Sequence, residues 1–277
     1  MIIKKIYINT YAKDFKFCNL CVTSIRYWYP DIEIVLIKDI LKGSFNTCFL
    51  ENLFNVQVFN SNEKYGWGYG KLEPLFISRE ESFLVLDSDT ILTGPILDLV
   101  QDIDEYFVVD EEIQNTERFN EIYYDKSLIN QVNYGFRPLE YSFNTGQWFG
   151  TSGIIDRSVF NETIHWASPR INKFPDIIKN GEQGHLNYHF HKLEQQNKIT
   201  IKRLKIMYFP LSFNVHFKWN SLRLKQNNKN FIVHWAGIKK PILLMPNKML
   251  LFFYLNQYRK KTNIWIAFKL LIKLMHS

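Results

Sequence analysis

Cysteines and long apolar runs are both scarce in this chain of 277 residues. It has three cysteines, Cys18, Cys21 and Cys48, and no second Cys-x-x-Cys pair follows the first one to complete a zinc site. Because Cys18 and Cys21 fall in a helical pattern with no flanking glycine or proline, we expect reduced structural thiols in a cytosolic protein. No stretch of about 20 uninterrupted apolar residues occurs, so the sequence predicts no membrane-spanning helix. The opening stretch MIIKKIYINTY leads directly into a strand pattern, and we therefore expect no signal peptide.

Acidic residues are missing after Glu194. The last 83 residues carry 16 of the 34 lysines and arginines, and the first 194 carry the other 18 together with all 27 aspartates and glutamates. The formal net charge of +7 is therefore the sum of an acidic front part and a strongly basic carboxyl-terminal third. Such a basic surface attracts an anion, and the candidates are a phosphate-bearing small molecule, an anionic membrane and a nucleic acid.

The composition permits a large folded core. Apolar residues make up 46% of the chain and aromatic residues 16%, which argues against disorder. The length fits one α/β domain with an appendage. The expected strands cover 5–11, 32–38, 56–60 and 82–87, and the expected helices cover 14–29 and 71–78. Strands that alternate with helices predict a mixed, mostly parallel sheet with helices on both faces.

The second half of the chain is less regular. We expect a strand at 107–112, polar loops or small helices over 113–142, a strand or hairpin at 146–156, a helix over 184–195 and a late strand at 229–237. On that helix His185 and His189 are four residues apart. The glutamate that follows the first histidine in metalloproteases is absent, so we expect a pair on the helix surface and not a zinc site.

Two aspartates follow a buried strand in FLVLDSDTIL, residues 83–92. Asp87 and Asp89 stand at the carboxyl end of that strand, where parallel sheets bind ligands. A cation between them would relieve their repulsion, and carboxylates are hard ligands for Mg²⁺ or Mn²⁺, which in turn neutralise a diphosphate.

Three interpretations of the aspartate pair remain open. The first is the metal site of a glycosyltransferase. The second is a haloacid-dehalogenase-like phosphohydrolase, in which Asp87 would be the nucleophile and Asp89 the acid/base. The third is a solvated or capping pair. Two strand–helix units precede the pair and nothing acidic follows Glu194, which favours the first interpretation over the second.

The segment HWAGIKKP, residues 234–241, resembles the H-x-x-G-x-x-K-P stretch of family 8 glycosyltransferases of GT-A fold, such as the bacterial lipooligosaccharide galactosyltransferases. The resemblance implies a Rossmann-like fold for transfer from nucleotide-diphospho-sugars. It also implies that His234 is the third metal ligand, and that Gly237 and Lys240 contact the diphosphate. An imidazole ligand suits Mn²⁺ better than Mg²⁺.

The segment EQGHLN, residues 182–187, is similar to the D-Q-D-x-L-N segment of the same family. The similarity implies that the Gln183 side chain faces the anomeric carbon and that Glu182 contacts the donor sugar or the acceptor. Gly184 stands where the family has its second aspartate, so one contact to the donor sugar is missing from the pattern.

Weaker similarities add further expected contacts. FNTGQW, residues 143–148, is similar to the family's F-N-x-G segment and implies that Asn144 and Thr145 lie near the donor sugar. The residues expected to contact the nucleotide or its diphosphate are Asn9, Thr10 and Tyr11 in INTY, Lys71 in YGKLEPL, and Ser88. Four aromatic residues are candidates for stacking on an acceptor sugar, although core positions are the commoner alternative: Trp148, Phe149, Trp219 and Trp235.

The character of the chain changes at Pro246. Residues 247–277 predict a basic amphipathic helix, with Ile264 and Leu271 on the apolar face and Lys269 on the opposite one. This helix either packs on the core or lies in a membrane interface, and the lack of acidic residues favours an anionic membrane surface. We therefore expect a catalytic domain over 1–246 and a membrane-associating tail over 247–277.

The sequence thus predicts a metal-dependent glycosyltransferase with Mn²⁺ (or Mg²⁺) as cofactor and Gln183 and Asp89 as catalytic residues. The donor is expected to be a UDP-sugar, and the acceptor a saccharide or lipid-linked saccharide of a cell-surface glycan, as in lipopolysaccharide biosynthesis. Retention of the anomeric configuration is implied by the resemblance. The expected location is the cytoplasmic face of a bacterial inner membrane, as a peripheral protein. The phosphohydrolase is the alternative, and a non-catalytic protein that binds nucleic acid or membrane is a remote one. No motif that reads nucleic acid is recognisable, so we expect no nucleic-acid partner.

Overall fold

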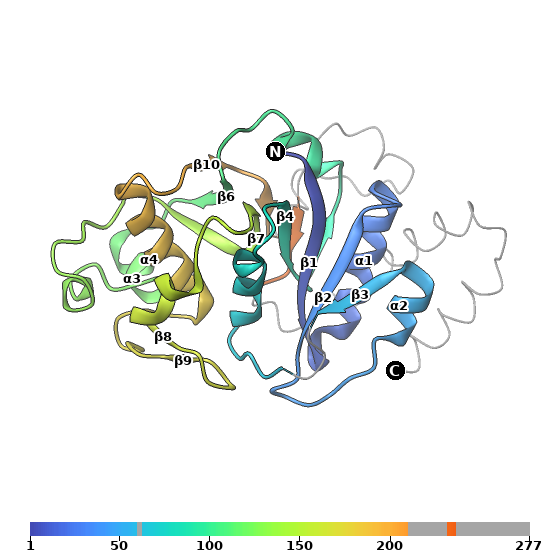
Figure 1. Cartoon of the computed structure of the whole chain (residues 1–277), viewed down its shortest axis with the longest axis horizontal. Helices are drawn as coiled ribbons and strands as arrows, with labels where there is room; N and C mark the ends of the chain where they lie inside the picture. The colour runs from blue at the N-terminus through green and yellow to red at the C-terminus, as the bar shows by residue number, and fades with distance from the viewer. Residues whose placement is uncertain (60–62, 210–231, 237–277) are drawn as a thin grey trace.

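The computed structural model of the chain describes residues 1–59, 63–209 and 232–236, and its centre is a sheet with helices on both faces (Figure 1). In spatial order, the seven strands described in this sheet are β10 (Ile201–Leu204), β6 (Phe107–Glu112), β7 (Ser142–Thr151), β4 (Ser82–Asp87), β1 (Ile3–Tyr11), β2 (Glu33–Asp39) and β3 (Val56–Phe59). Only β7 runs antiparallel to its neighbours in this sheet, β4 and β6. The predicted mixed, mostly parallel α/β sheet is therefore confirmed.

Two hydrophobic cores cover the two faces of the sheet. Ile6 and Ile8 of β1 pack into the core that contains α1 (Phe15–Trp28) and α2 (Cys48–Phe54), whereas Tyr7 between them packs into the core that contains α4 (Glu182–Gln195). Figure 1 shows α1 and α2 on one side of the sheet and α4 on the other. Successive side chains of a strand point to opposite faces, so a strand buried on both faces must be apolar along its whole length.

The cysteines of α1 belong to the first of these cores. Cys18 and Cys21 are free thiols with no exposed surface, and burial raises the pKa of Cys18 to about 12. A thiol that stays protonated is a poor nucleophile, which confirms that these two are structural thiols and not a reactive pair. The third cysteine, Cys48, is free and exposed at the start of α2.

Two local predictions need correction. The helix predicted at 71–78 is a 3₁₀ helix, η2 (Tyr69–Phe76), with Pro74 inside it. Of the segment predicted as a strand or hairpin at 146–156, residues 146–151 are the end of a single long strand, β7, which begins at Ser142, and 152–156 lie beyond that strand. Shorter elements connect the rest: η1 (Ala12–Asp14), η3 (Ile96–Val100), α3 (Thr116–Ile122), η4 (Ile129–Gln131), η5 (Arg157–Glu162), β8 (Ile164–His165) and β9 (Ile171–Asn172).

The prediction that His185 and His189 lie on a helix surface is wrong. Both side chains are fully buried, and the His191 side chain is fully buried as well. The helix α4 packs against β7 on one side, and on the others it meets a smaller aromatic cluster that includes Tyr123, Tyr124 and Phe136. An analysis of hydrophobic periodicity counts histidine as polar and therefore predicts an exposed position. A neutral imidazole can nevertheless be buried when its nitrogens have hydrogen-bond partners.

A second, three-stranded sheet consists of β11 (Met207–Tyr208), β12 (Ile232–His234) and β5 (Thr90–Leu92). β12 accounts for the described part of the late strand predicted at 229–237, and it pairs antiparallel with β5. This pairing places β12 next to the end of β4, because β5 follows β4 directly in the chain. Among the helices of the described ranges, none combines the length and apolarity that a bilayer span requires.

Candidate active site

Asp87 and Asp89 lie at the carboxyl edge of the main sheet, where β4 ends and the chain turns back as β5. Two hydrogen bonds fix this turn. The Ser88 N–H donates to the Asn9 carbonyl over 3.1 Å, and the Thr90 hydroxyl donates to the Asp87 carbonyl over 2.7 Å. Ser88 is buried, so the turn is held against the end of β1 while the two aspartates on either side of it remain half-buried.

His234 reaches this turn from β12. It pairs with Thr90 across the β12–β5 ladder, and the next residue, Trp235, donates its N–H to the Asp89 carbonyl over 3.0 Å. The His234 Nε2 atom then lies 3.1 Å from Asp89 Oδ1 and 3.6 Å from Asp87 Oδ2. One ligand atom from each of the three residues lies within 4.8 Å of the others. The structure therefore brings together the three residues that the sequence predicted as metal ligands.

The charges of this group balance one another. Burial alone would lower the pKa of His234, but Asp89 and Asp87 outweigh it and hold the pKa above its usual value. Burial likewise opposes ionisation of Asp89, whereas His234 and Lys71 hold its pKa below the usual range. The imidazole and the two carboxylates therefore interact favourably with one another. Two hard oxygens and one imidazole nitrogen are a donor set that fits Mn²⁺ or Mg²⁺.

A bulge in β7 closes one side of the group. Val109 of β6 pairs with Trp148, but the next residue of β6, Asp110, pairs with Asn144, so residues 145–147 are extra on β7. Bulges of this kind redirect a strand next to a site. A Cβ placed on Gly146 would lie 2.2 Å from His234 Cε1 and 2.7 Å from His234 Nδ1. Glycine at 146 therefore lets the imidazole sit directly against the strand.

Lys71 lies in the middle of the site. Its side chain is 4% exposed, and its Nζ atom is 2.9 Å from Asp87 Oδ1 and 3.2 Å from the Thr145 carbonyl, with Glu182 as a second ion-pair partner. Burial alone would lower the pKa of Lys71, but Asp87 and Glu182 raise it above its usual value. An ammonium group has three donors, and here three protein oxygens accept them. The residue predicted to contact the diphosphate is thus a cation that connects β4, β7 and α4.

The start of α4 completes the group. The Thr145 hydroxyl lies 2.8 Å from Glu182 Oε1 and 3.2 Å from Gln183 Oε1. Burial raises the pKa of Glu182, with Asp87 adding to the rise and Lys71 opposing it. Asn187, one turn further along α4, exchanges hydrogen bonds of 3.0 Å with both the N–H and the carbonyl of Phe143. Asn187 therefore docks the helix on β7 and sets the distance between Gln183 and the bulge.

Asn144, the other predicted donor-sugar residue, is 7% exposed and belongs to the same bulge. Its Oδ1 atom accepts the Gly146 N–H over 2.8 Å, and its Nδ2 atom lies 3.4 Å from Glu112 Oε1. The amide therefore supports the bulge from within, while Glu112 links it to the end of β6.

Comparison with known structures gives matches to glycosyltransferases that extend over most of this chain. An active-site mutant of LgtC, a galactosyltransferase, aligns over 90% of this chain and 94% of its own, at 11% identity and a TM-score of 0.55. The apo form of the bifunctional glycosyltransferase WbbM aligns over 92% of this chain and 49% of its own, at 14% identity and 0.55. The apo glycosyltransferase GlyE of Streptococcus pneumoniae aligns over 95% and 64%, at 12% identity and 0.56. This chain has a glycosyltransferase fold. No family model matches it, and no curated protein matches it in sequence.

One departure from the predicted family pattern has a steric cause in this glycosyltransferase fold. A Cβ placed on Gly184 would lie 2.3 Å from the carbonyl oxygens of Lys179 and Tyr123. No side chain fits there without movement of the backbone, so an aspartate is excluded at 184.

The end of β1 forms the remaining edge of the site. Asn9 is half-buried, with an Oδ1 atom that has no hydrogen-bond partner within the described ranges, whereas Thr10 is fully buried and lies against the Cys18 thiol. The half-buried Tyr11 hydrogen-bonds to Asp14, which the sequence suggested only as the start of a helix. Asp14 does not cap that helix through its side chain.

Asp14 is an acidic neighbour of the metal-ligand group that the sequence did not reveal. Burial and then the negative charge of Asp89 raise the pKa of Asp14 to about 6. A third carboxyl group in this position strengthens the negative potential at the edge of the sheet.

Several predicted positions lie outside the described residues. They are Gly237, Lys240, Trp219 and the tail over 247–277, together with the domain limit at 246. Of the aromatic residues suggested for stacking on a sugar, Trp148 and Phe149 have no exposed surface and Trp235 is 4% exposed, so these three are core residues.

Proposed function

We propose that this protein is a metal-dependent glycosyltransferase that moves a sugar from a nucleoside diphosphate sugar, a UDP-sugar, to a saccharide acceptor. The observation that carries the proposal is the convergence of Asp87, Asp89 and His234 at the carboxyl edge of a glycosyltransferase fold. His234 lies far from the two aspartates in the chain, and a mixed oxygen and nitrogen donor set at a sheet edge is suited to a divalent cation beside a diphosphate.

Asp87, Asp89 and His234 would hold Mn²⁺ or Mg²⁺, and the imidazole favours Mn²⁺. When bound, the ion would stabilise the negative charge of the departing diphosphate as a Lewis acid. Lys71 fixes one oxygen of Asp87 through an ion pair of 2.9 Å. We propose that Gly237 and Lys240 contact the diphosphate and that Asn9, Thr10, Tyr11 and Ser88 surround the nucleotide.

Gln183 is the proposed neighbour of the anomeric carbon. Its amide lies within hydrogen-bond distance of the Thr145 hydroxyl, at the junction of α4 and the β7 bulge. Asp87 and Glu182 each pair with the Lys71 ammonium, and Asp89 lies 3.1 Å from His234, which disfavours a general-base role for any of them. This fits transfer with retention, in which the leaving phosphate accepts the proton of the acceptor hydroxyl.

The phosphohydrolase alternative gains nothing from the geometry. The His234 imidazole, 3.1 Å from Asp89, is a metal ligand or a counter-ion. Asp87, which would be the nucleophile of a phosphohydrolase, is paired with Lys71. A carboxylate held by a buried ammonium is a weak nucleophile, because its charge is already neutralised.

The test is release of UDP from a panel of UDP-sugars, in MnCl₂ and in EDTA. We expect slow release that requires metal and that falls at least a hundredfold in Asp89→Asn and His234→Ala. Asp98→Asn, which changes an exposed acid outside the site, is the matched control and should behave as the wild type. Phosphate release from p-nitrophenyl phosphate without UDP release would refute the transferase in favour of the hydrolase.

We propose further that residues 247–277 attach the protein to an anionic membrane, on the cytoplasmic face of a bacterial inner membrane, where a lipid-linked saccharide or lipopolysaccharide precursor is the acceptor. The basic, acid-free composition of this segment supports the proposal. Removal of 247–277 should abolish co-sedimentation with vesicles that contain phosphatidylglycerol. Equal co-sedimentation of the full and shortened chains would contradict it.

A further inference from the structure

An indole faces solvent in the loop that leads into the site. Trp67 precedes η2 and is 76% exposed, whereas the tryptophans at 148 and 235 are buried. A large apolar ring gains free energy when it leaves water, so an exposed tryptophan on a fixed loop is a feature of surfaces that bind other molecules.

The backbone of this loop is held in a conformation that tryptophan rarely adopts. Gly66, Trp67 and Gly68 have φ angles of +73°, +43° and +78°, all in the left-handed region. Glycine accepts this region freely, whereas a bulky residue is an outlier there. Strain of this kind persists where the surroundings determine the backbone, and it concentrates at functional sites.

Contacts on both sides determine the loop. The Asp39 carboxylate at the end of β2 accepts the Tyr65 N–H over 3.2 Å and the Gly66 N–H over 2.8 Å. On the other side, the Trp67 carbonyl accepts the Glu182 N–H over 3.3 Å. The indole is therefore carried by a backbone that is fixed between β2 and α4, and a fixed ring loses little conformational freedom when a ligand binds.

The loop touches the site directly. A Cβ placed on Gly68 would lie 2.2 Å from Glu182 Oε2 and 3.1 Å from Lys71 Cε. Trp67 is thus one residue away from the side chains that surround the proposed point of sugar transfer. The Trp67 carbonyl accepts its hydrogen bond from Glu182 at the start of α4, the residue next to Gln183.

We propose that Trp67 is a stacking platform for a sugar ring of the acceptor saccharide. The inference rests on the proposed function and adds to it a binding subsite for the acceptor sugar. The apolar face of a pyranose ring covers the flat indole, while the sugar hydroxyls keep their contact with water or with polar groups of the site. The commitment to the acceptor follows from the bond between Trp67 and α4, because the nucleotide is proposed to lie at the end of β1.

Two substitutions of Trp67 separate the ring from the backbone. Trp67→Asn removes the ring and keeps the fold, because asparagine tolerates a positive φ, and Trp67→Phe retains a flat ring. Tyr134→Asn is the control, since Tyr134 is 97% exposed in another loop. The full-length variants are applied to an array of galactose-, glucose- and heptose-containing oligosaccharides, and their affinity for UDP with Mn²⁺ is measured by calorimetry.

We expect the wild type and Tyr134→Asn to bind the same glycans, Trp67→Phe to bind within about threefold, and Trp67→Asn to bind at least tenfold more weakly, with UDP affinity changed less than threefold. Unchanged glycan binding in Trp67→Asn, no glycan binding by the wild type, or a loss of UDP affinity, which would indicate stacking on a nucleobase, overturns the platform. Wild-type protein that binds glycans but releases no UDP from any UDP-sugar would instead sink the transferase proposal.

Discussion

A lysine lies between two carboxylates near each end of β4, and the two clusters differ in their contact with water. The carboxyl-end cluster consists of Lys71, Asp87 and Glu182, and the amino-end cluster consists of Lys5, Glu33 and Glu81. The Lys71 side chain is 4% exposed and the Lys5 side chain is 27% exposed. The lysine of one cluster is thus buried, whereas the lysine of the other is in contact with water.

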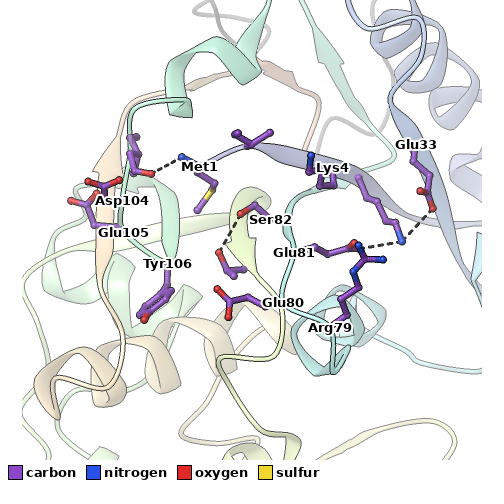
Figure 2. Close-up of a pocket in the computed structure, with 14 residues that line it drawn as sticks. Met1, Lys4, Glu33, Arg79, Glu80, Glu81, Ser82, Asp104, Glu105 and Tyr106 are labelled. Carbon is purple, nitrogen blue, oxygen red and sulfur yellow. Dashed lines mark hydrogen bonds and ion pairs between the residues drawn. The ribbon is translucent and has the colours of Figure 1, made fainter.

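The amino end opens into a hollow of about 780 Å³ that charged side chains of both signs line. Figure 2 shows Glu33 and Glu81 in this hollow. The Lys5 Nζ atom lies 3.4 Å from Glu33 Oε1 and 3.1 Å from Glu81 Oε1. Water in such a hollow screens each pair, so exposed ion pairs contribute little. At the carboxyl end the protein itself must solvate the charges, and the comparison teaches that burial, more than the charge pattern, gives the Lys71 cluster its role in fixing the site.

Among the variants that test this difference between the two clusters, Lys71→Met should have the largest effect on stability. It leaves the buried Glu182 and the half-buried Asp87 without their cation, and removal of one partner from a buried pair lowers the free energy of unfolding by about 3–5 kcal/mol. Urea unfolding at pH 7 measures the loss. In the double variant Lys71→Met, Glu182→Gln, part of the loss should return because one unpaired carboxylate is gone. A loss below about 1 kcal/mol for Lys71→Met would mean that water reaches the cluster after all.

Buried histidines extend the comparison to α4. Burial lowers the pKa of His185 to about 4 and that of His191 to about 3. In the unfolded chain these histidines have a pKa of about 6.5 and bind protons below that pH, whereas in the folded chain they stay neutral until the pH is much lower. Acid therefore favours the unfolded chain, and the free energy of unfolding decreases as the pH falls from 6.5 towards 4. We expect about 2 kcal/mol less stability per histidine at pH 5 than at pH 7.

Urea unfolding at the two pH values checks this expectation. His191→Phe should reduce the difference between pH 7 and pH 5, whereas His165→Phe, at an exposed position, should leave it unchanged. Equal pH dependence in both variants would assign the acid sensitivity to other groups.

A third effect concerns the two ends of β7. Gly146→Ala places a methyl group against His234 at the carboxyl end, whereas Thr151→Ala removes a side chain that lines the hollow at the amino end. A residue that orients a metal ligand affects affinity by about tenfold or more. We expect Mn²⁺ affinity, measured by calorimetry, to fall about tenfold in Gly146→Ala and to stay unchanged in Thr151→Ala. Equal affinities in the two variants would remove Gly146 from the account of the site.

The sequence predicted much of the carboxyl end and little of how it is held. Apolar runs located β1, β2 and β4, and short motifs identified Asp87 and His234, because these signals are local. The antiparallel pairing of β12 with β5 is a contact between distant segments, and it alone explains why the two residues meet. The burial of Lys71, the carboxyl group of Asp14 and the steric exclusion of a side chain at Gly184 likewise depend on packing that no local pattern records.

Lys5→Met should have the smallest effect and gives the comparison its baseline. Glu33 has a 36% exposed side chain that water can solvate once the ammonium is gone, and Glu81, which is 10% exposed, lines the hollow beside it. The expected loss in the free energy of unfolding is about 0–1 kcal/mol, and it should shrink further in 0.5 M NaCl because salt screens exposed pairs. The Lys71→Met loss should respond much less to salt. If both variants lost the same amount and lost it in the same salt-dependent way, the difference in burial between the two ends of β4 would carry no energetic meaning, and the case for Lys71 as the cation that fixes the site would fall with it.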